Sequence, residues 1–324
     1  FTDSLGYRLT GSYNDVGGYT KNIHTGNDLN GSEEWTVRGK LRWSGELTDL
    51  VWASDYGERE CDCTASPMRS IEPFGGNEDT VEKILGRLDP LEPDDEATKV
   101  NHNREPYYET EQWGHALTIN RNWGEHTLTS ITAYRESEFD GTGDGDLDGQ
   151  PIDVIGVVQP SITEQDQFTQ ELRIASPVGD TLDYVAGLFY FDQTAKRTLQ
   201  RDLVVLGSSG VADFSVDTRN WAAFGELTWY LSDDWRLLLG ARYTEDELDY
   251  DYRRTGSGAG IQPSIGPLGD GTDEDDLSGK ASLQWDYSEE GMAYLSYVQG
   301  YKGPAYDITF GSKVETLQRV EPET

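Results

Sequence analysis

Residues 220–243 read NWAAFGELTWYLSDDWRLLLGARY and consist of two alternating runs joined by a short acidic turn. One side of the first run is apolar or small, with an aromatic residue near each end, and the second run repeats this pattern. Alternation with a period of two predicts β-strands whose two faces meet different surroundings. The apolar face comprises Trp221, Ala223, Gly225, Leu227 and Trp229 in the first run and Trp235, Leu237, Leu239, Ala241 and Tyr243 in the second. A soluble β-sandwich would also show such a face, so the hairpin alone does not decide the class.

The stretch from Trp35 to Trp43 separates the two environments more sharply. Its apolar face is bracketed by these two tryptophans, and its other face carries Arg38, Lys40 and Arg42. Three cations side by side are too costly for a packed protein core, but they suit a water-filled lumen. The tryptophans are spaced as interfacial residues on a tilted membrane strand of about 9–11 residues.

Composition narrows the class of protein. The chain has 324 residues, a net charge of −34 and a mean hydropathy of −0.67. This acidity excludes nucleic acid as a partner, because phosphate binding requires a basic surface. No stretch reaches the roughly 20 apolar residues of a membrane-spanning helix. Abundant Tyr and Trp with only 2 Cys suit either an outer-membrane barrel or a secreted carbohydrate-handling β-protein.

Short turns and long loops alternate along the chain. Short turns are predicted at 44–49, 124–125, 176–180, 232–234 and 288–291, and long loops at 14–34, 57–107, 140–165, 199–217 and 251–276. Hydrophobic spacing predicts a short helix within the second of these loops, over residues 79–88. Antiparallel neighbours place all short turns at one end and all long loops at the other, as in outer-membrane barrels with brief periplasmic turns and long extracellular loops. We count about eleven strands and predict an all-β, antiparallel transmembrane β-barrel.

Five segments resemble the barrel of TonB-dependent outer-membrane receptors: Gln170–Ser176, Ala222–Thr228, Leu239–Asp246, Tyr297–Lys302 and Glu321–Thr324. The resemblance implies a barrel of about 22 strands around an N-terminal plug, of which residues 1–324 supply about the second to the twelfth strand. It places the plug and the later strands outside this sequence. Gly303-Pro304-Ala305 departs from the Ser-Gly-Gly common in the family after Gly-Tyr-Lys, which affects the expected local loop conformation.

The resemblance implies active import of a scarce, large solute such as a ferric siderophore across the outer membrane of a Gram-negative bacterium. It implies energy supplied by a TonB complex that engages the absent N-terminal segment, and contact with outer-membrane lipids and lipopolysaccharide. Two alternatives stay open, namely a passive porin-like channel and a secreted carbohydrate-active protein. No nucleophile elbow, phosphate loop or histidine ligand motif is present, so we expect no enzyme activity and no required cofactor.

The candidate ligand-binding residues are cations and aromatics at the lumen or the outer mouth. The cations could attract an anionic solute, or they could pair with lumen carboxylates such as Glu171 and Glu226. The tyrosines could stack on a ligand, or they could serve as interfacial residues. The candidates are Arg38, Lys40, Arg173, Arg242, Tyr107 and Tyr108, with Arg8, Arg42 and Lys280 as further lumen cations.

Two further motifs lie in predicted loops. Asp144, Asp146 and Asp148, followed by Gly149, match the first half of a calcium loop, although the twelfth position is Ile155 rather than a bidentate Glu. The alternative is a solvated acidic loop. Cys61 and Cys63 have no adjacent histidine for a metal site, so we expect a disulfide at an oxidising cell surface.

Overall fold

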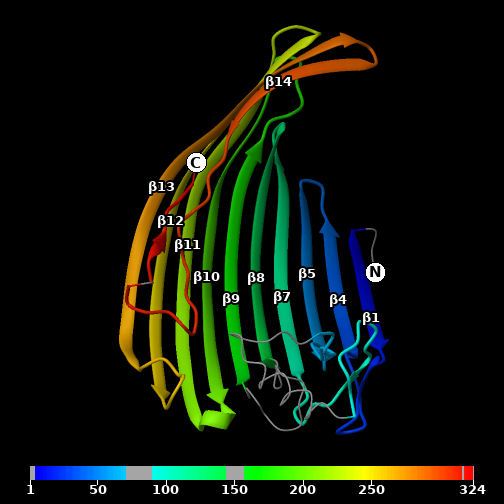
Figure 1. Ribbon diagram of the computed structural model, residues 1–324. Helices are drawn as coiled ribbons and strands as arrows, with labels where there is room; N and C mark the ends of the chain where they lie inside the picture. Colours follow the sequence, from blue (N-terminus) through cyan, green and yellow to red (C-terminus); the bar gives the residue numbers. More distant parts are fainter. Residues whose placement is uncertain (1–3, 71–89, 144–156, 316, 324) are drawn as a thin grey trace.

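The computed structural model describes residues 4–70, 90–143, 157–315 and 317–323 and is built around one antiparallel sheet of eleven strands (Figure 1). Each strand pairs with its neighbours in chain order, with no crossover. The strands are β1 (Leu5–Val16), β4 (Ser32–Ser44), β5 (Thr48–Cys61), β7 (Tyr107–Trp123), β8 (His126–Gly143), β9 (Val157–Ala175), β10 (Leu182–Leu203), β11 (Ser208–Tyr230), β12 (Trp235–Ser257), β13 (Ile265–Ser288) and β14 (Gly291–Gln299). This order confirms the predicted antiparallel all-β architecture.

The predicted short turns and the predicted long loops lie at opposite ends of the sheet. The five short turns are at the top in Figure 1, and the connections at the other end include a short one, residues 204–207, between β10 and β11. None of the described residues forms a helix that is long and apolar enough to cross a membrane. The helix predicted over residues 79–88 lies outside the described residues.

The two faces of the sheet differ along every strand. In the register, Val37 is opposite Tyr56 and Tyr56 is opposite Trp113, so apolar and aromatic side chains of neighbouring strands share one face. We call it the outer face. Large apolar side chains stay solvent-exposed on this face, among them Leu239, which is 38% exposed. The opposite face, called the inner face, carries Arg38, Arg173 and Arg242. This division confirms the two-sided pattern of the sequence.

Aromatic rings form a band across the outer face toward the long-loop end. Neighbouring rings touch, with centroids 5.0 Å apart for Trp35 and Tyr56 and 4.6 Å apart for Tyr190 and Trp221. The band consists of Trp35, Tyr56, Trp113, Tyr134, Phe168, Tyr190, Trp221 and Tyr243. A second band at the short-turn end includes Trp43, Trp123, Trp229, Trp235 and Trp285. Two aromatic bands around an apolar zone are the pattern of a membrane-spanning barrel wall.

A belt of carboxylates lies immediately beyond the first aromatic band. On the same outer face, the position two residues closer to the long-loop end of each strand is acidic on seven strands and is Arg219 on β11. The acidic residues are Glu33, Glu58, Glu111, Glu136, Asp166, Asp192 and Glu245. Several ring hydroxyls donate to these carboxylates, as Tyr190 does to Asp192 at 2.8 Å. The acidity of the chain is therefore concentrated outside the apolar zone of the wall.

The predicted loops proved too long, most clearly in three places. Residues 199–217 and 251–276 were expected to be loops, but the ladder continues through them, with Arg201 opposite Gly210 and Asp249 opposite Gly271. The predicted loop 140–165 is likewise shortened, since β8 reaches Gly143 and β9 starts at Val157. Main-chain hydrogen bonds hold a strand whatever its side chains are. Beyond the apolar zone both faces meet water, so the alternation that identifies a strand in sequence is lost.

A small sheet lies at the long-loop end. It comprises β2 (Thr20–Asn22), β3 (Asp28–Leu29) and β6 (Lys99–Val100), with β2 antiparallel to β3 and parallel to β6. Leu29, Ala65 and Val100 form its apolar core. Residues from two long connections are thus tied together beyond the strands, at the bottom in Figure 1.

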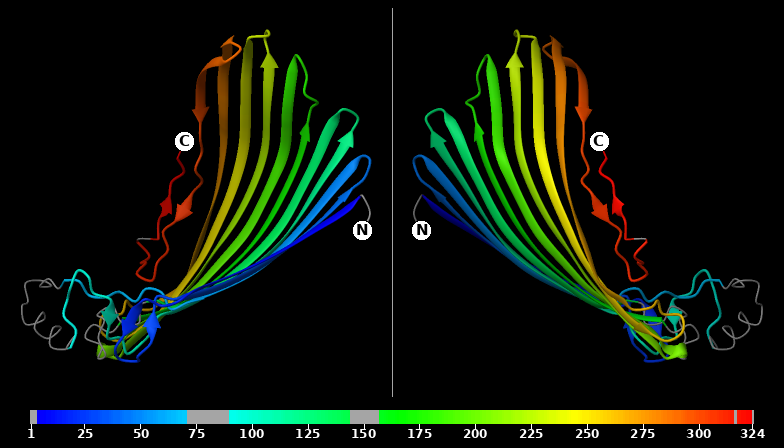
Figure 2. Two further views of the ribbon diagram at one scale, coloured as in Figure 1. Left: turned by 90° about the vertical axis from the view of Figure 1, so that its right-hand side faces the viewer. Right: turned by 90° about the vertical axis from the view of Figure 1, so that its left-hand side faces the viewer.

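The chain leaves the sheet after β14, and residues 300–323, called the end segment, run beside the strands instead of extending them (red in Figures 1 and 2). The end segment contains β15 (Ala305–Tyr306) paired with β16 (Arg319–Val320). Phe310 and Leu317 pack with Tyr250 and Tyr252 of β12 in a buried cluster. Since these tyrosines share a face with Arg242, the end segment covers the inner face.

Candidate functional site

The inner-face cations fall into two groups. Some pair with carboxylates of the same face: Arg173 Nη1 lies 3.2 Å from Glu171, Lys280 Nζ 2.5 Å from Glu226, and Arg42 Nε 2.9 Å from Asp49. The pairing of inner cations with Glu171 and Glu226, one of the two interpretations of the sequence, therefore holds for Arg173 and Lys280.

The second group has no carboxylate partner in the described parts of the chain. Arg38 and Lys40 are exposed on β4. Lys40 lies opposite Arg8 of β1, so the register places like charges side by side. Such an arrangement is unfavourable unless an anion or water screens it. This cationic patch, formed by Arg8, Arg38 and Lys40, is a place where the inner face can accept negative charge.

Arg242 of β12 also lacks a carboxylate partner among the described residues. Its guanidinium carbon lies 5.5 Å from the ring centre of Phe189 and 5.9 Å from that of Phe224, and Nε donates to the Thr244 hydroxyl at 3.1 Å. Aromatic faces attract cations without neutralising them. The two rings hold the guanidinium in place and leave its charge available.

Glycine at position 187 makes this ring packing possible. Gly187 of β10 lies opposite Phe224 of β11. A Cβ added at this position would come within 2.6 Å of the Phe224 ring and 2.7 Å of the backbone oxygen of Leu172. A side chain there would displace the ring from Arg242.

A cavity of about 360 Å³ separates this part of the wall from the start of the end segment. Its polar lining includes the buried Thr244, and Asn220, whose amide donates to Asp246 at 2.5 Å. The hydroxyl of Tyr301 is buried in the same place. Burial and the nearby carboxylates of Asp246, Glu274 and Asp276 raise the pKa of Tyr301 above its usual value. This phenol therefore stays a neutral donor at physiological pH.

The two candidate tyrosines point in opposite directions. Tyr108 lies on the inner face, where its hydroxyl is 3.2 Å from that of Thr64. Tyr107 lies on the outer face with Trp113, and its hydroxyl donates to Glu109 at 2.5 Å. This hydrogen bond, together with burial and nearby carboxylates, raises the pKa of Tyr107 to about 12. Tyr107 therefore does not face the lumen, because strand alternation turns it outward, and a ligand contact of Tyr107 at the outer mouth stays a prediction.

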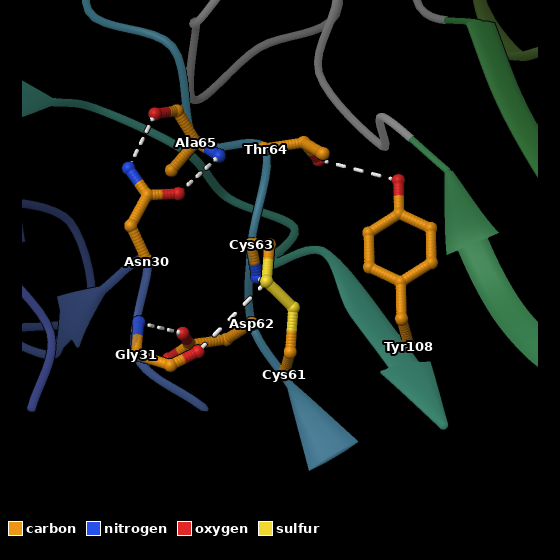
Figure 3. The surroundings of a disulfide bond; sticks show 8 residues. All are labelled: Asn30, Gly31, Cys61, Asp62, Cys63, Thr64, Ala65 and Tyr108. Atoms are coloured by element: carbon orange, nitrogen blue, oxygen red, sulfur yellow. Dashed lines mark hydrogen bonds between the residues drawn. A yellow bond between two sulfur atoms is a disulfide. The ribbon is translucent and has the colours of Figure 1, made fainter. Parts of the chain in front are cut away.

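Cys61 and Cys63 are joined by a disulfide at the end of β5 (Figure 3). The adjoining loop is held mainly by Asn30, whose amide donates to the Ala65 carbonyl at 2.8 Å and accepts from the Ala65 N–H at 3.0 Å. Asp62 accepts from the N–H of Gly31 at 2.6 Å. The sequence predicted the disulfide, but gave no signal for the role of Asn30.

The predicted calcium ligands Asp144, Asp146 and Asp148 lie outside the described residues. In the parts of the chain that are described, carboxylate oxygens of Glu58, Glu60 and Glu109 lie within 4.8 Å of one another. Glu58 belongs to the outer acidic belt, and Glu60 and Glu109 lie next to it on the same face, farther from the apolar zone. Exposed carboxylates at this spacing are common without a metal, so we assign no metal site.

The family model for the TonB-dependent receptor-like β-barrel matches residues 69–324. The chain belongs to the TonB-dependent receptor family. The wall described above is accordingly part of such a barrel, with its outer face toward lipid and its inner face toward the lumen. Members of this family act as receptors and transporters rather than enzymes.

Curated relatives include the pesticin receptors of Yersinia enterocolitica serotype O:8 / biotype 1B and of Yersinia pestis. Each is 29% identical to this chain over 144 residues, which cover 44% of this chain and 20% of the relative. The similarity in sequence is thus limited to one part of a longer receptor.

Solved structures share the fold over nearly the whole chain. The ferric yersiniabactin uptake receptor FyuA from Yersinia pestis superposes with a TM-score of 0.73 at 19% identity, covering 98% of this chain and 45% of FyuA. The siderophore receptor PiuA from Acinetobacter baumannii gives a TM-score of 0.61 at 13% identity, covering 92% of this chain and 45% of PiuA. The chain therefore spans less than half the length of each of these two receptors.

Proposed function

We propose that this TonB-dependent receptor chain forms part of the wall of a transporter in the outer membrane of a Gram-negative bacterium. The transporter imports a scarce anionic solute, of which a ferric siderophore is the preferred candidate. Energy comes from a TonB complex, which acts on a plug supplied by another part of the receptor. The names of the related receptors and the chemistry of the inner face both support this function.

The observation that carries the proposal is that three of the candidate inner-face cations, Arg38, Lys40 and Arg242, form no ion pair with a described carboxylate. The chain holds 60 acidic and 26 basic residues, yet none of these three side chains forms an ion pair with a described carboxylate. In a lumen with low-dielectric walls, such charges attract an anion and exclude other cations. The guanidinium of Arg242, which lines the cavity beside the end segment, offers donors to oxygen atoms of a chelate.

Uptake of radiolabelled ferric siderophore by cells that carry the full-length receptor tests this role. Arg38→Gln with Lys40→Gln, and separately Arg242→Gln, should reduce uptake at limiting concentration about 10-fold, since each charge-assisted contact contributes about 1.5–3 kcal/mol. Lys196→Gln is the matched control, because it removes a cation from the outer face. Equal uptake by all variants and the parent would contradict an anionic solute contacting these residues.

A passive channel is the second candidate, because the exposed inner face of this wall is polar. It predicts steady conductance of the full-length receptor in a planar bilayer and growth that does not depend on TonB. A blocked bilayer current together with uptake that is lost on deletion of TonB supports active import instead.

We further propose that the outer acidic belt meets the headgroup region of the outer leaflet. Carboxylates beside anionic lipopolysaccharide repel it unless divalent cations lie between them. Calcium, bound there or at Asp144, Asp146 and Asp148, should raise the thermal stability of the receptor in native outer membranes. A melting temperature unchanged by chelator would contradict this.

A further inference from the structure

A second cavity, of about 740 Å³, lies on the outer face across β7 to β11. Small side chains form its floor, and larger apolar side chains rise on either side. The floor includes Ser130, Ala186 and Ala223, and the walls include Ile119, Leu172 and Leu188. Leu172 and Leu188 are 49% and 54% exposed, so the groove is open to the surrounding medium. Its place on the outer face puts it against lipid.

The cation at the end of this groove is Arg121. Arg121 lines it, is exposed, and makes no ion pair within the described residues. It lies two residues before Trp123, at the short-turn end of β7, which is the periplasmic end in this family. The other described cations on the outer face, Lys196, Arg219 and Arg253, lie at the opposite end with the acidic belt.

An unpaired arginine on a lipid-facing strand needs a counter-charge. Placing an arginine in the bilayer is costly at the midplane and much less costly near the interface, where the side chain reaches the headgroups. His126 Nε2 and the Tyr184 hydroxyl, 2.9 Å apart, mark the same interface on β8 and β10. The described outer-face strand residues of this periplasmic half include no carboxylate. A lipid phosphate is therefore the anion within reach of Arg121.

We propose that the groove and Arg121 together bind one glycerophospholipid of the periplasmic leaflet. An acyl chain lies over Ala186 and Ala223, and the phosphate accepts hydrogen bonds from the Arg121 guanidinium. The cation lies at headgroup level and the apolar floor extends from it toward the membrane centre, which is the charge distribution of a phospholipid. This inference rests on the barrel fold and does not depend on the identity of the imported solute.

The test is native mass spectrometry of the detergent-purified, full-length receptor titrated with palmitoyl-oleoyl-phosphatidylglycerol. The parent should retain one lipid more tightly than all others. Arg121→Gln should weaken this binding about 10-fold, as expected for loss of a charge-assisted contact. Arg121→Lys should restore part of it. Ala186→Leu, which fills the floor and leaves the charge, should weaken it by a similar factor.

Arg253→Gln is the matched control and should retain the lipid as the parent does, because Arg253 lies on the outer face beyond the acidic belt. Equal lipid retention by Arg121→Gln and the parent would overturn the role of the cation. Unchanged retention by Ala186→Leu would overturn the role of the groove. Siderophore uptake should stay at the parental level in Arg121→Gln, which separates this proposal from the proposed transport function.

Discussion

The guanidinium of Arg254 donates a 2.6 Å hydrogen bond to the carbonyl oxygen of Phe310, and this contact joins the end segment to β12. Arg254 is 1% exposed and also donates to the carbonyl oxygens of Ser312 and Pro263. The guanidinium carbon of Arg201, on β10, lies over the Phe310 ring, 4.5 Å from its centre. A single buried arginine thus fixes the position of the end segment over the inner face.

Replacing Arg254 should release the end segment. Arg254→Gln removes several bonds to carbonyl groups that stay buried, at a local cost of about 3 kcal/mol. Hydrogen exchange of residues 308–312 should then become about 100-fold faster, as measured by mass spectrometry on the full-length receptor. Arg253→Gln, one residue away and exposed on the outer face, should leave exchange unchanged. Equal protection in both variants would show that the apolar contacts of Phe310 suffice.

Two adjacent leucines of β12 test the assignment of faces. Leu239 lies on the outer face between the aromatic bands, and Leu238 lies on the inner face. Leu239→Arg should lower the free energy of unfolding by about 2–4 kcal/mol, because the charge enters the lipid core. Leu238→Arg should lower it less, because the arginine reaches the lumen. Denaturant titration of the receptor in lipid vesicles measures both. A larger loss for Leu238→Arg would reverse the two faces.

The loop sheet should lose order in acid through Glu105. Burial opposes its ionisation, but hydrogen bonds from Thr25, Asn27 and Asn22 outweigh this and lower the pKa of Glu105 below its usual value. A carboxyl with a lowered folded-state pKa stabilises the fold above its unfolded pKa of about 4.3, and this contribution is lost as pH falls through the folded value. Protease sensitivity of residues 90–106 should therefore rise below about pH 4.

Glu105→Gln provides the control for that pH dependence. It should be more sensitive than the parent at pH 7 and should show little further change in acid. A parallel rise in both proteins would assign the acid response to other carboxylates.

The loop beside β5 should depend more on Asn30 than on the disulfide. Closing a three-residue loop contributes only about 1.6 kcal/mol in the chain-entropy treatment. Asn30→Ala loses both bonds to Ala65 and a third to the Thr20 hydroxyl at 2.8 Å. The substitution also leaves alanine at a backbone φ of 67°, so it should lower the local stability of the loop by about 3 kcal/mol. Limited proteolysis after residue 62 should be faster in Asn30→Ala than in the Cys61→Ser, Cys63→Ser double variant. The opposite order would make the disulfide the main anchor.

Sequence patterns predicted the wall well wherever the two faces of a strand meet different media. Trp35 to Trp43 and Trp221 to Tyr243 were assigned to the correct faces, since alternation there reflects lipid on one side and water on the other. The prediction failed for residues 251–276, where charged and small residues on both faces conceal a strand. The face of Tyr107 stayed open for a related reason, because an aromatic residue in a polar stretch gives no sign of the face it occupies.

The sequence by itself determined the antiparallel strands, their turns and the cationic character of one face, because a period of two and short turn motifs are local properties. Only the tertiary structure decided which of these cations are neutralised, as Arg173 is by Glu171 and Arg242 is not. It also decided that the end segment folds over the inner face through Arg254 and Phe310, 56 residues apart. Such contacts depend on the register of whole strands and on backbone carbonyls. Neither can be predicted from the alternation of apolar and polar residues in the sequence.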